Sequence, residues 1–296
     1  MPSRIAFVVA ALVVVSSTLT AQWPSYPTPD VPRDAKGQPV LTGPPPRMAD
    51  GKVDFSGIWT RGGGGGGGRG RGAGAAPAPT TTPEGIPLSS FGEVAGRGYP
   101  LPLQPWAAEL KKKRMADNSK DNPDVWCLPI GLMQYHNHPQ PRQIVQAKNI
   151  MLIGYESNYG LRYIYLDGRP APNNDPQPWW FGYSRGRYEG NDTLVVETTN
   201  FIAEERATWH DVNGTPWSDA LKMTERFRRP TFGTLEIDVT LDDPKTFTKP
   251  VTVRVNQRLM VDQEMIEFIC NENEQSTDHI PKPGQPGLPG TPAPPK

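Results

Sequence analysis

The chain has 296 residues, with 31 basic and 31 acidic side chains and a formal net charge of zero. This length suits one large domain or two small ones. The balanced charge argues against a dedicated nucleic-acid binder, which needs a clustered basic surface. Four His and two Cys are too few for a rich metal or disulfide framework, and no cofactor is predicted.

The N-terminus has the three-part layout of a secretory signal peptide. Residues 1–4 carry one Arg, residues 5–15 are unbroken apolar, and residues 16–21 are small and polar apart from Leu19. The apolar run is about half the length that spans a bilayer. A cleaved signal at 1–21 is therefore favoured over a retained anchor. We predict a secreted or periplasmic protein with no transmembrane span after cleavage.

Cys127 and Cys270 are the only cysteines. In an oxidising compartment, an even count with no spare thiol favours one disulfide between them. Such a bond contributes roughly 3–5 kcal/mol by closing a long loop. Two buried thiols that never meet are the alternative. A catalytic thiolate is disfavoured, because no positive charge lies near Cys127 in the sequence to lower the thiol pKa.

Composition changes mark four regions outside the predicted core. Residues 22–53 are rich in Pro and predict an extended arm. Residues 62–85 contain seven consecutive glycines and predict a disordered insertion, because ordering glycine costs much backbone entropy. Residues 104–117 predict one helix, with Pro105 in its first turn and a basic run near its C-terminal end. Residues 275–296, rich in Pro and Gly, predict a disordered tail.

From residue 140 onward, apolar and polar residues alternate with a period of two, which is typical of β-strands. A short strand at 54–60 precedes them. Nine strands with short connections favour an antiparallel meander at 54–274, most completely closed as an up-and-down barrel, with a sandwich as the alternative. The predicted strands are 142–147, 150–157, 161–167, 181–189, 193–201, 220–229, 234–242, 250–260 and 264–272.

Three carboxylates fall on strand faces that are otherwise apolar. They are Glu197, Glu225 and Glu267. A buried ionised carboxylate needs a cationic partner or keeps its proton. Internal salt bridges that fix the barrel register are one interpretation. The other is a carboxylate–Arg cluster in a ligand cavity, with Glu225 and Glu267 as candidate general acids or bases.

Aromatic residues with polar tips accompany these strands and suit a small-molecule pocket, although they also suit an ordinary β core. The candidate ligand-binding residues are Tyr163, Tyr165, Tyr183, Arg185, Arg187 and Glu197.

His136 and His138 are two positions apart and are weak metal candidates. In a strand both imidazoles would point to one face and could share a metal ion. Pro139 and Pro141 follow at once and predict a loop instead. Nothing in the spacing singles out a third ligand, so no metal site is predicted.

The segment Gly182-Tyr183-Ser184-Arg185-Gly186 matches the nucleophile elbow of α/β-hydrolases. That elbow requires a strand before the serine and a helix after it. A second strand follows here, so a strand punctuated by glycines is the favoured interpretation.

Two family resemblances follow from short motifs. Gly57-Ile58-Trp59 before a meander resembles the lipocalin or calycin-like barrels, in which the Trp closes one end. Several phrases together resemble a family of secreted bacterial proteins with no assigned activity. Tyr188 stands where that family usually has Trp, and Trp217 stands where a His often precedes Ser218. The resemblance implies export and a β-rich domain, with no catalytic residue to carry over. The phrases are Gly57-Ile58-Trp59, Cys127-Leu-Pro-Ile-Gly131, Ile164-Tyr-Leu-Asp-Gly-Arg169, Gly186-Arg-Tyr-Glu-Gly-Asn-Asp-Thr-Leu-Val-Val-Glu-Thr198, Thr224-Glu-Arg-Phe-Arg-Arg229 and Cys270-Asn-Glu-Asn273.

Three functional hypotheses follow. The first is an exported barrel that binds a small, partly apolar molecule in a cavity lined by aromatic, Arg and Glu side chains. The second is a secreted lyase, isomerase or hydrolase that uses a buried carboxylate as general acid or base. The third is a structural envelope protein without a pocket. The sequence leaves the oligomeric state open.

Overall fold

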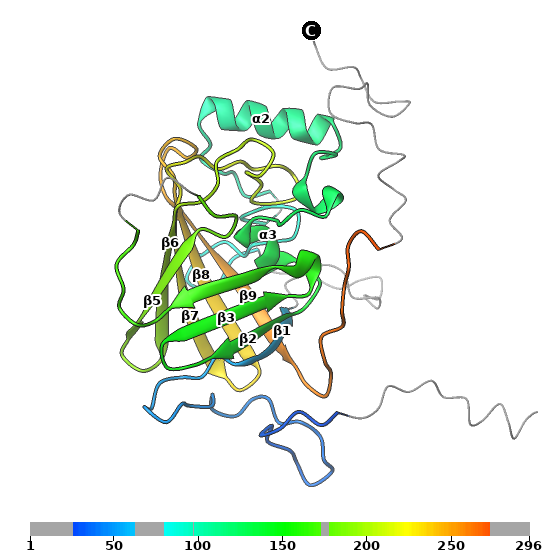
Figure 1. Cartoon of the computed structure of the whole chain (residues 1–296), viewed down its shortest axis with the longest axis vertical. Helices are drawn as coiled ribbons and strands as arrows, with labels where there is room; N and C mark the ends of the chain where they lie inside the picture. The colour runs from blue at the N-terminus through cyan, green and yellow to red at the C-terminus, as the bar shows by residue number, and fades with distance from the viewer. Residues whose placement is uncertain (1–25, 63–79, 97, 173–177, 273–296) are drawn as a thin grey trace, which may run out of the picture.

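A computed structural model describes residues 26–62, 80–96, 98–172 and 178–272 (Figure 1). The predicted signal peptide, the tail from residue 273 and residues 63–79 of the glycine-rich insertion lie outside the described residues. Residues 80–85, the end of that insertion, form a hydrogen-bonded turn in which the Gly85 amide donates to the Thr82 carbonyl at 2.9 Å.

The described chain folds into a closed β-barrel, as the period-two pattern predicts. Nine strands pair in chain order, and the last returns to the first (Figure 1). Eight of the nine strands predicted beyond residue 140 are present, and the predicted strand at 54–60 supplies the ninth. The strands are β1 (Gly57–Arg61), β2 (Arg142–Gln146), β3 (Ile150–Tyr155), β4 (Leu161–Tyr165), β5 (Tyr183–Glu189), β6 (Thr193–Thr199), β7 (Lys222–Thr231), β8 (Thr234–Asp242) and β9 (Val251–Met260).

One neighbouring pair departs from the antiparallel meander. β4 and β5 run parallel, with Ile164 opposite Ser184 and Tyr165 opposite Arg185. A closed ring with an odd number of strands must contain at least one parallel pair, because strand direction cannot alternate all the way round. β5 therefore begins at the same end of the barrel as β4.

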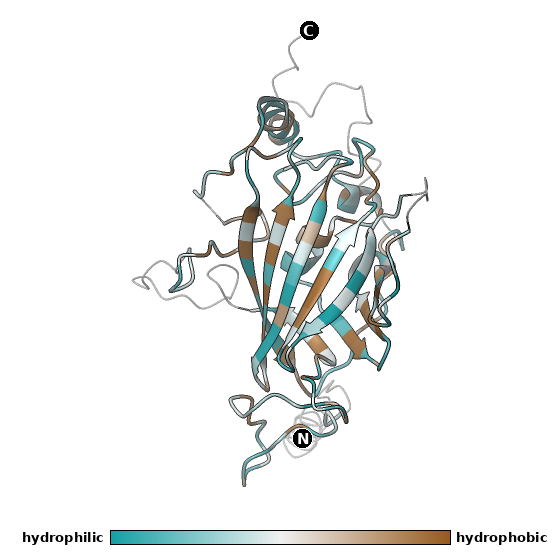
Figure 2. Ribbon diagram, turned by 90° about the vertical axis from the view of Figure 1, so that its left-hand side faces the viewer, coloured by the Kyte–Doolittle hydropathy of each residue, from teal (hydrophilic) through white to brown (hydrophobic). Residues whose placement is uncertain are grey.

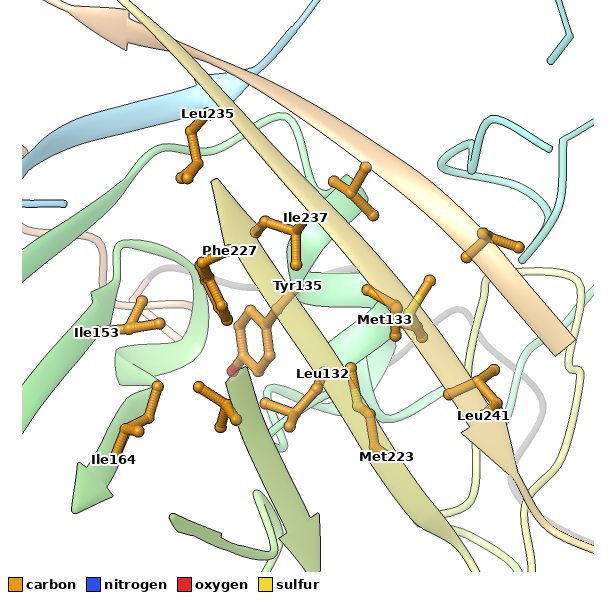
Figure 3. Close-up of a cluster of buried hydrophobic side chains, with 14 of the residues drawn as sticks. Leu132, Met133, Tyr135, Ile153, Ile164, Met223, Phe227, Leu235, Ile237 and Leu241 are labelled. Carbon is orange, nitrogen blue, oxygen red and sulfur yellow. The ribbon is translucent and has the colours of Figure 1, made fainter. Parts of the chain in front are cut away.

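Side chains fill the barrel interior. Alternate residues of β7, β8 and β9 point inward, and hydropathy alternates along the strands (Figure 2). Phe227, Ile237 and Leu241 belong to one buried cluster inside, and each is at most 1% exposed (Figure 3). Each such side chain contributes about 1.5–3 kcal/mol on burial. The interior is therefore the hydrophobic core of the protein.

A short helix that the sequence did not predict enters one end of the barrel. All six residues of α3 (Leu132–Asn137) are buried. Tyr135 points into the interior near Ile153 and Phe227 (Figure 3). Six residues are too few to show a helical period, and the prolines that follow favour a loop. Burial against the rest of the protein, not helix propensity, stabilises α3, which we call the plug helix.

The Pro-rich arm covers the opposite end. The amide of Phe232 donates to the Gly43 carbonyl, and the amide of Gly233 donates to the Leu41 carbonyl, both at 2.8 Å. Above the arm, Trp59 is fully buried, and its Nε1–H donates to the Phe55 carbonyl at 2.9 Å.

The predicted helix is present as α2 (Pro105–Ala116), which lies across the same end as α3 (Figure 1). Two 3₁₀ turns, η1 (Pro123–Trp126) and η2 (Ser157–Tyr159), complete the elements. Cys127 and Cys270 form the predicted disulfide, with their Cα atoms 5.4 Å apart. Within the described ranges, no helix has the length and apolar character needed to cross a bilayer.

Candidate functional site

An ionic cluster lies inside the barrel, where β4 and β7 face the plug helix α3. Glu225 Oε1 lies 2.7 Å from His136 Nε2 and accepts a 2.9 Å hydrogen bond from Arg162 Nη1. Arg162 Nη2 donates to the second carboxylate oxygen. The three side chains are at most 1% exposed. The cluster therefore joins the plug helix to two strands.

Two hydroxyl groups complete the surroundings of the guanidinium. Arg162 Nε donates to Ser184 Oγ at 3.1 Å, and Nη2 donates to Thr198 Oγ1 at 2.9 Å. The two hydroxyl oxygens are 3.0 Å apart. Ser184 therefore lies on a strand and accepts a hydrogen bond from Arg162. This agrees with the prediction that its motif is a strand with glycines, not a nucleophile elbow.

The charges of the cluster oppose the effect of burial on Glu225. Burial alone raises the pKa of its carboxyl group, but Arg162 and His136 outweigh burial and lower the pKa to about 2. Burial lowers the pKa of His136, while Glu225 opposes this. Because an ionised carboxylate only accepts hydrogen bonds, His136 donates from Nε2 to Glu225. Glu225 stays ionised and is a poor proton donor.

A separate cavity of about 570 Å³ lies beside α2. Its walls come from the helix, from residues 119–128 and from residues 205–209. Apolar side chains form much of the surface, with Lys113, Asp117 and Lys120 among the polar groups. The lining residues are Leu110, Lys113, Arg114, Asp117, Ser119, Lys120, Asp121, Trp126, Leu128, Glu205, Arg206 and Trp209.

Arg114 fixes the helix against one wall of this cavity. Its Nη1 donates to the Thr208 carbonyl at 2.7 Å, and its Nη2 donates to the Glu205 carbonyl at 2.6 Å. The guanidinium also stacks over the Trp209 ring, 4.2 Å from the centroid. Burial lowers the Arg114 pKa to about 10, so the side chain remains charged at neutral pH.

The sequence did not predict this cavity, because two segments far apart in the chain, 110–128 and 205–209, build it. The basic run near the C-terminal end of α2 does not indicate a buried residue, yet Arg114 is only 6% exposed. Trp126 precedes a cysteine of the disulfide, and Trp209 precedes His210. These two tryptophans were the available signal, but no periodic pattern connects segments so far apart in the chain.

The six predicted ligand-binding residues gather on β4, β5 and β6, but they lie on the outer face. Arg162 and Ile164 point inward from β4, so Tyr163 and Tyr165 point outward. Arg185 and Glu197 lie opposite each other on neighbouring strands, 3.7 Å apart and about one third exposed. Tyr183 and Arg187 share that face.

Both faces of β6 carry buried apolar side chains, and this explains why Glu197 was predicted on the wrong side of the barrel wall. Leu194 and Val196 point inward and are fully buried, while outward-pointing Val195 is only 2% exposed. Alternation alone could not tell which face was the core. The prediction that Glu197 belongs to an interior cavity is therefore wrong.

Glu267 is also not buried. It is exposed, on an irregular segment after β9, and the predicted strand at 264–272 is absent. β9 already pairs with β1, so the closed barrel has no free edge for another strand. The segment runs instead to the disulfide at Cys270. Of the three predicted carboxylates, only Glu225 lies in the interior.

The two histidines do not converge on one metal. His136 lies on α3 and contacts Glu225, whereas His138 caps the helix and lies 3.2 Å from Asp124. Residues two apart on a helix point about 200° apart, unlike residues in a strand. Among the described residues, no group of three His, Cys, Asp or Glu side chains could hold a metal ion.

No protein-family model, curated protein or solved structure matches this chain.

Proposed function

We propose that this protein is a secreted or periplasmic binding protein for a small, partly apolar molecule, which it holds in the cavity beside α2. The observation that carries the proposal is the cavity itself. Its volume of about 570 Å³ lies within the range that suits small-molecule ligands. Export is supported by the signal-like N-terminus and by the disulfide.

The chemistry of the cavity fits a ligand with an apolar body and a polar end. Leu110, Leu128 and Trp126 offer apolar and aromatic surface. Lys113 and Asp117 belong to the same lining and offer charged hydrogen-bonding groups. Arg114 stiffens the wall through its carbonyl contacts, which reduces the entropy lost when a ligand binds.

The two alternative hypotheses have less support. The enzyme hypothesis needs a buried carboxylate that can exchange a proton with a substrate, but Glu225 is enclosed and held by Arg162 and His136. The structural hypothesis predicts a filled barrel, which is present, but it does not account for the cavity beside α2. A binding protein accounts for both the filled barrel and the cavity beside α2.

The proposal is tested with the fluorescent probe 8-anilinonaphthalene-1-sulfonate, which has an apolar body and one charge. We expect saturable binding to the wild-type protein. Leu128→Trp places a larger side chain in the cavity wall and should weaken binding at least tenfold. Met115→Trp adds the same ring on α2 at a position that is 48% exposed and outside the lining, and should leave binding unchanged.

Thermal unfolding of both variants verifies that they are folded. Equal binding of the probe by all three proteins would contradict the proposed site. Native mass spectrometry of protein recovered from its own medium then identifies the retained compound.

A further inference from the structure

A second cavity, of about 740 Å³, lies beside the irregular segment that follows β9. Residues 260–267 form one of its walls. The other wall belongs to the barrel, where Pro141 precedes β2 and Glu156 follows β3. No described residue lines both this cavity and the one beside α2, so the two are separate.

Contacts at several points hold the segment in place along this cavity. At its start, Asp262 Oδ1 accepts a hydrogen bond from the Thr28 amide at 2.9 Å. Further along, the Ile266 amide donates to Glu156 Oε2 at 3.2 Å, and the disulfide follows at the end of the segment. Figure 1 shows the segment, in orange to red, running beside the barrel. A wall fixed on both sides admits a small molecule more readily than a folded protein partner.

All charged side chains among the described residues of the lining are acidic. They are Glu156, Asp262, Glu264 and Glu267. Arg33, which is not part of the lining, pairs with Asp262. We call this space the acidic cavity. Charges of one sign in a cleft with apolar walls focus the electric field and raise the local concentration of oppositely charged ions. The acidic cavity therefore favours a cation over an anion.

The surroundings of Glu156 support this preference. Within the described chain, the Ile266 amide is the hydrogen-bond donor to its carboxylate. Burial raises the pKa of the Glu156 carboxyl group, and only this backbone hydrogen bond opposes the effect. The carboxylate thus loses hydration without a cationic partner among the described residues. A cation bound beside it would compensate for that loss.

Apolar side chains line the same cavity and are open to solvent. Ile266 is 54% exposed and Tyr26 is 44% exposed. Met260 and Met265 add flexible thioether side chains, which adapt to ligands of different shapes. A tyrosine ring also attracts a cation to its face. The lining therefore combines negative charge with apolar and aromatic surface.

We propose that the acidic cavity binds a small organic cation, namely a protonated amine that carries an apolar group. Glu156 pairs with the ammonium group, and Glu264 adds to the negative potential around it. Met265 and Ile266 contact the apolar group. A metal ion fits less well, because no three metal-ligating side chains converge anywhere in the described ranges. The volume of the cavity lies within the range of small-molecule sites.

Three dansyl probes that differ in charge test the proposal on the full-length protein. At neutral pH dansylcadaverine is a cation, dansylamide is neutral and dansylglycine is an anion. We expect saturable binding of dansylcadaverine, with dansylamide binding about tenfold more weakly and dansylglycine more weakly still. Added salt should weaken the binding of dansylcadaverine, because it screens exposed charges. The same titrations with Leu128→Trp, which narrows the cavity beside α2, remove any contribution from that cavity.

Glu156→Gln tests the site directly, because Gln keeps an acceptor for the Ile266 amide but removes the charge. It should weaken the binding of dansylcadaverine about fivefold, as expected for one partly exposed ion pair, and leave that of dansylamide unchanged. Glu109→Gln removes an exposed carboxylate of α2 and is the matched control, which should bind like the wild type. Thermal unfolding verifies that each variant is folded.

The proposal fails if dansylcadaverine shows no saturable binding, or if the wild type and Glu156→Gln bind it equally. Equal binding of the three probes by Leu128→Trp would also overturn it. So would a self-association, measured by light scattering, that Glu156→Gln abolishes in the absence of probe binding, because a basic side chain of a second copy would then fill the cavity. Binding of 8-anilinonaphthalene-1-sulfonate beside α2 is measured separately and does not depend on these results.

Discussion

At the scale of single residues, Glu225 shows how the barrel tolerates a charge in its core. A lone carboxylate in this position would lose its hydration without compensation. Arg162 and His136 replace water on both carboxylate oxygens, and Ser184 and Thr198 occupy further guanidinium donors. The free energy of each buried charge is therefore set more by its hydrogen-bonding and ionic partners than by its burial.

Glu225→Gln should destabilise the protein by about 3–5 kcal/mol, because it leaves the buried Arg162 without a countercharge. Denaturant unfolding measures the free energy of unfolding. Glu109→Gln is the control at an exposed position and should change it by less than about 0.5 kcal/mol. Equal stability of the two variants would contradict the structural role of the cluster.

The same carboxylate predicts an acid-sensitive stability. Its pKa is about 2 in the folded protein against 4.5 for an ordinary glutamate. The unfolded chain therefore binds a proton more readily, so this stabilisation is complete above pH 4.5 and is lost as the pH falls toward 2. Unfolding measured between pH 5 and pH 2 should show a shallower decline for Glu225→Gln than for the wild type. Parallel declines would contradict the assignment.

At the scale of elements, the position of α3 depends on the close approach of its backbone to neighbouring residues more than on helix propensity. Gly131 stands at its N-cap, in a space where a Cβ atom would lie 2.4 Å from the Trp209 carbonyl oxygen and 2.6 Å from the Trp217 ring. The backbone oxygen cannot move away without shifting its loop. A glycine therefore sets how deeply the plug helix enters the barrel.

Gly131→Ala should destabilise the protein by about 1–3 kcal/mol, as overpacking does in a well-packed core. Gly154→Ala on β3 is the matched control, because a Cβ atom there meets nothing within 4 Å. That variant should be neutral or slightly stabilising. Thermal unfolding of both variants gives the comparison, and a neutral Gly131→Ala would show that α3 can shift without cost.

At the scale of the whole molecule, the disulfide joins two segments that are 143 residues apart in sequence. Replacing both Cys127 and Cys270 with Ala should lower the free energy of unfolding by about 4–5 kcal/mol, because the unfolded chain regains the entropy of a long loop. Guanidinium unfolding of the variant, and of the wild type with and without a reductant, measures this. A variant as stable as the oxidised wild type would contradict the prediction.

The barrel could be predicted from sequence because its strands alternate clearly. Leu235, Ile237, Val239 and Leu241 are all buried, as their pattern predicts. Long strands supply several repeats of the pattern, and turn residues mark their ends. The disulfide could be predicted from the even number of cysteines together with the predicted export.

The candidate site could not be predicted in the same way, because it depends on contacts between distant segments. Arg114, Trp126 and Trp209 meet only after α2 has crossed the end of the barrel. The sequence also could not show which face of β6 points inward, since Val195 is buried on the outer side. Periodicity identifies the two faces of a strand, and only packing shows which one is enclosed.

The pairing of β1 with β9 has a consequence for folding kinetics. Ile58 lies opposite Met260, so this seam joins residues about 200 positions apart. Contacts of such high sequence separation slow folding, because the intervening chain must be ordered first. During synthesis, β1 must wait for nearly the whole chain before its partner exists. A polypeptide of this topology therefore completes its fold late, and a chain truncated before residue 251 should leave β1 with an unpaired edge.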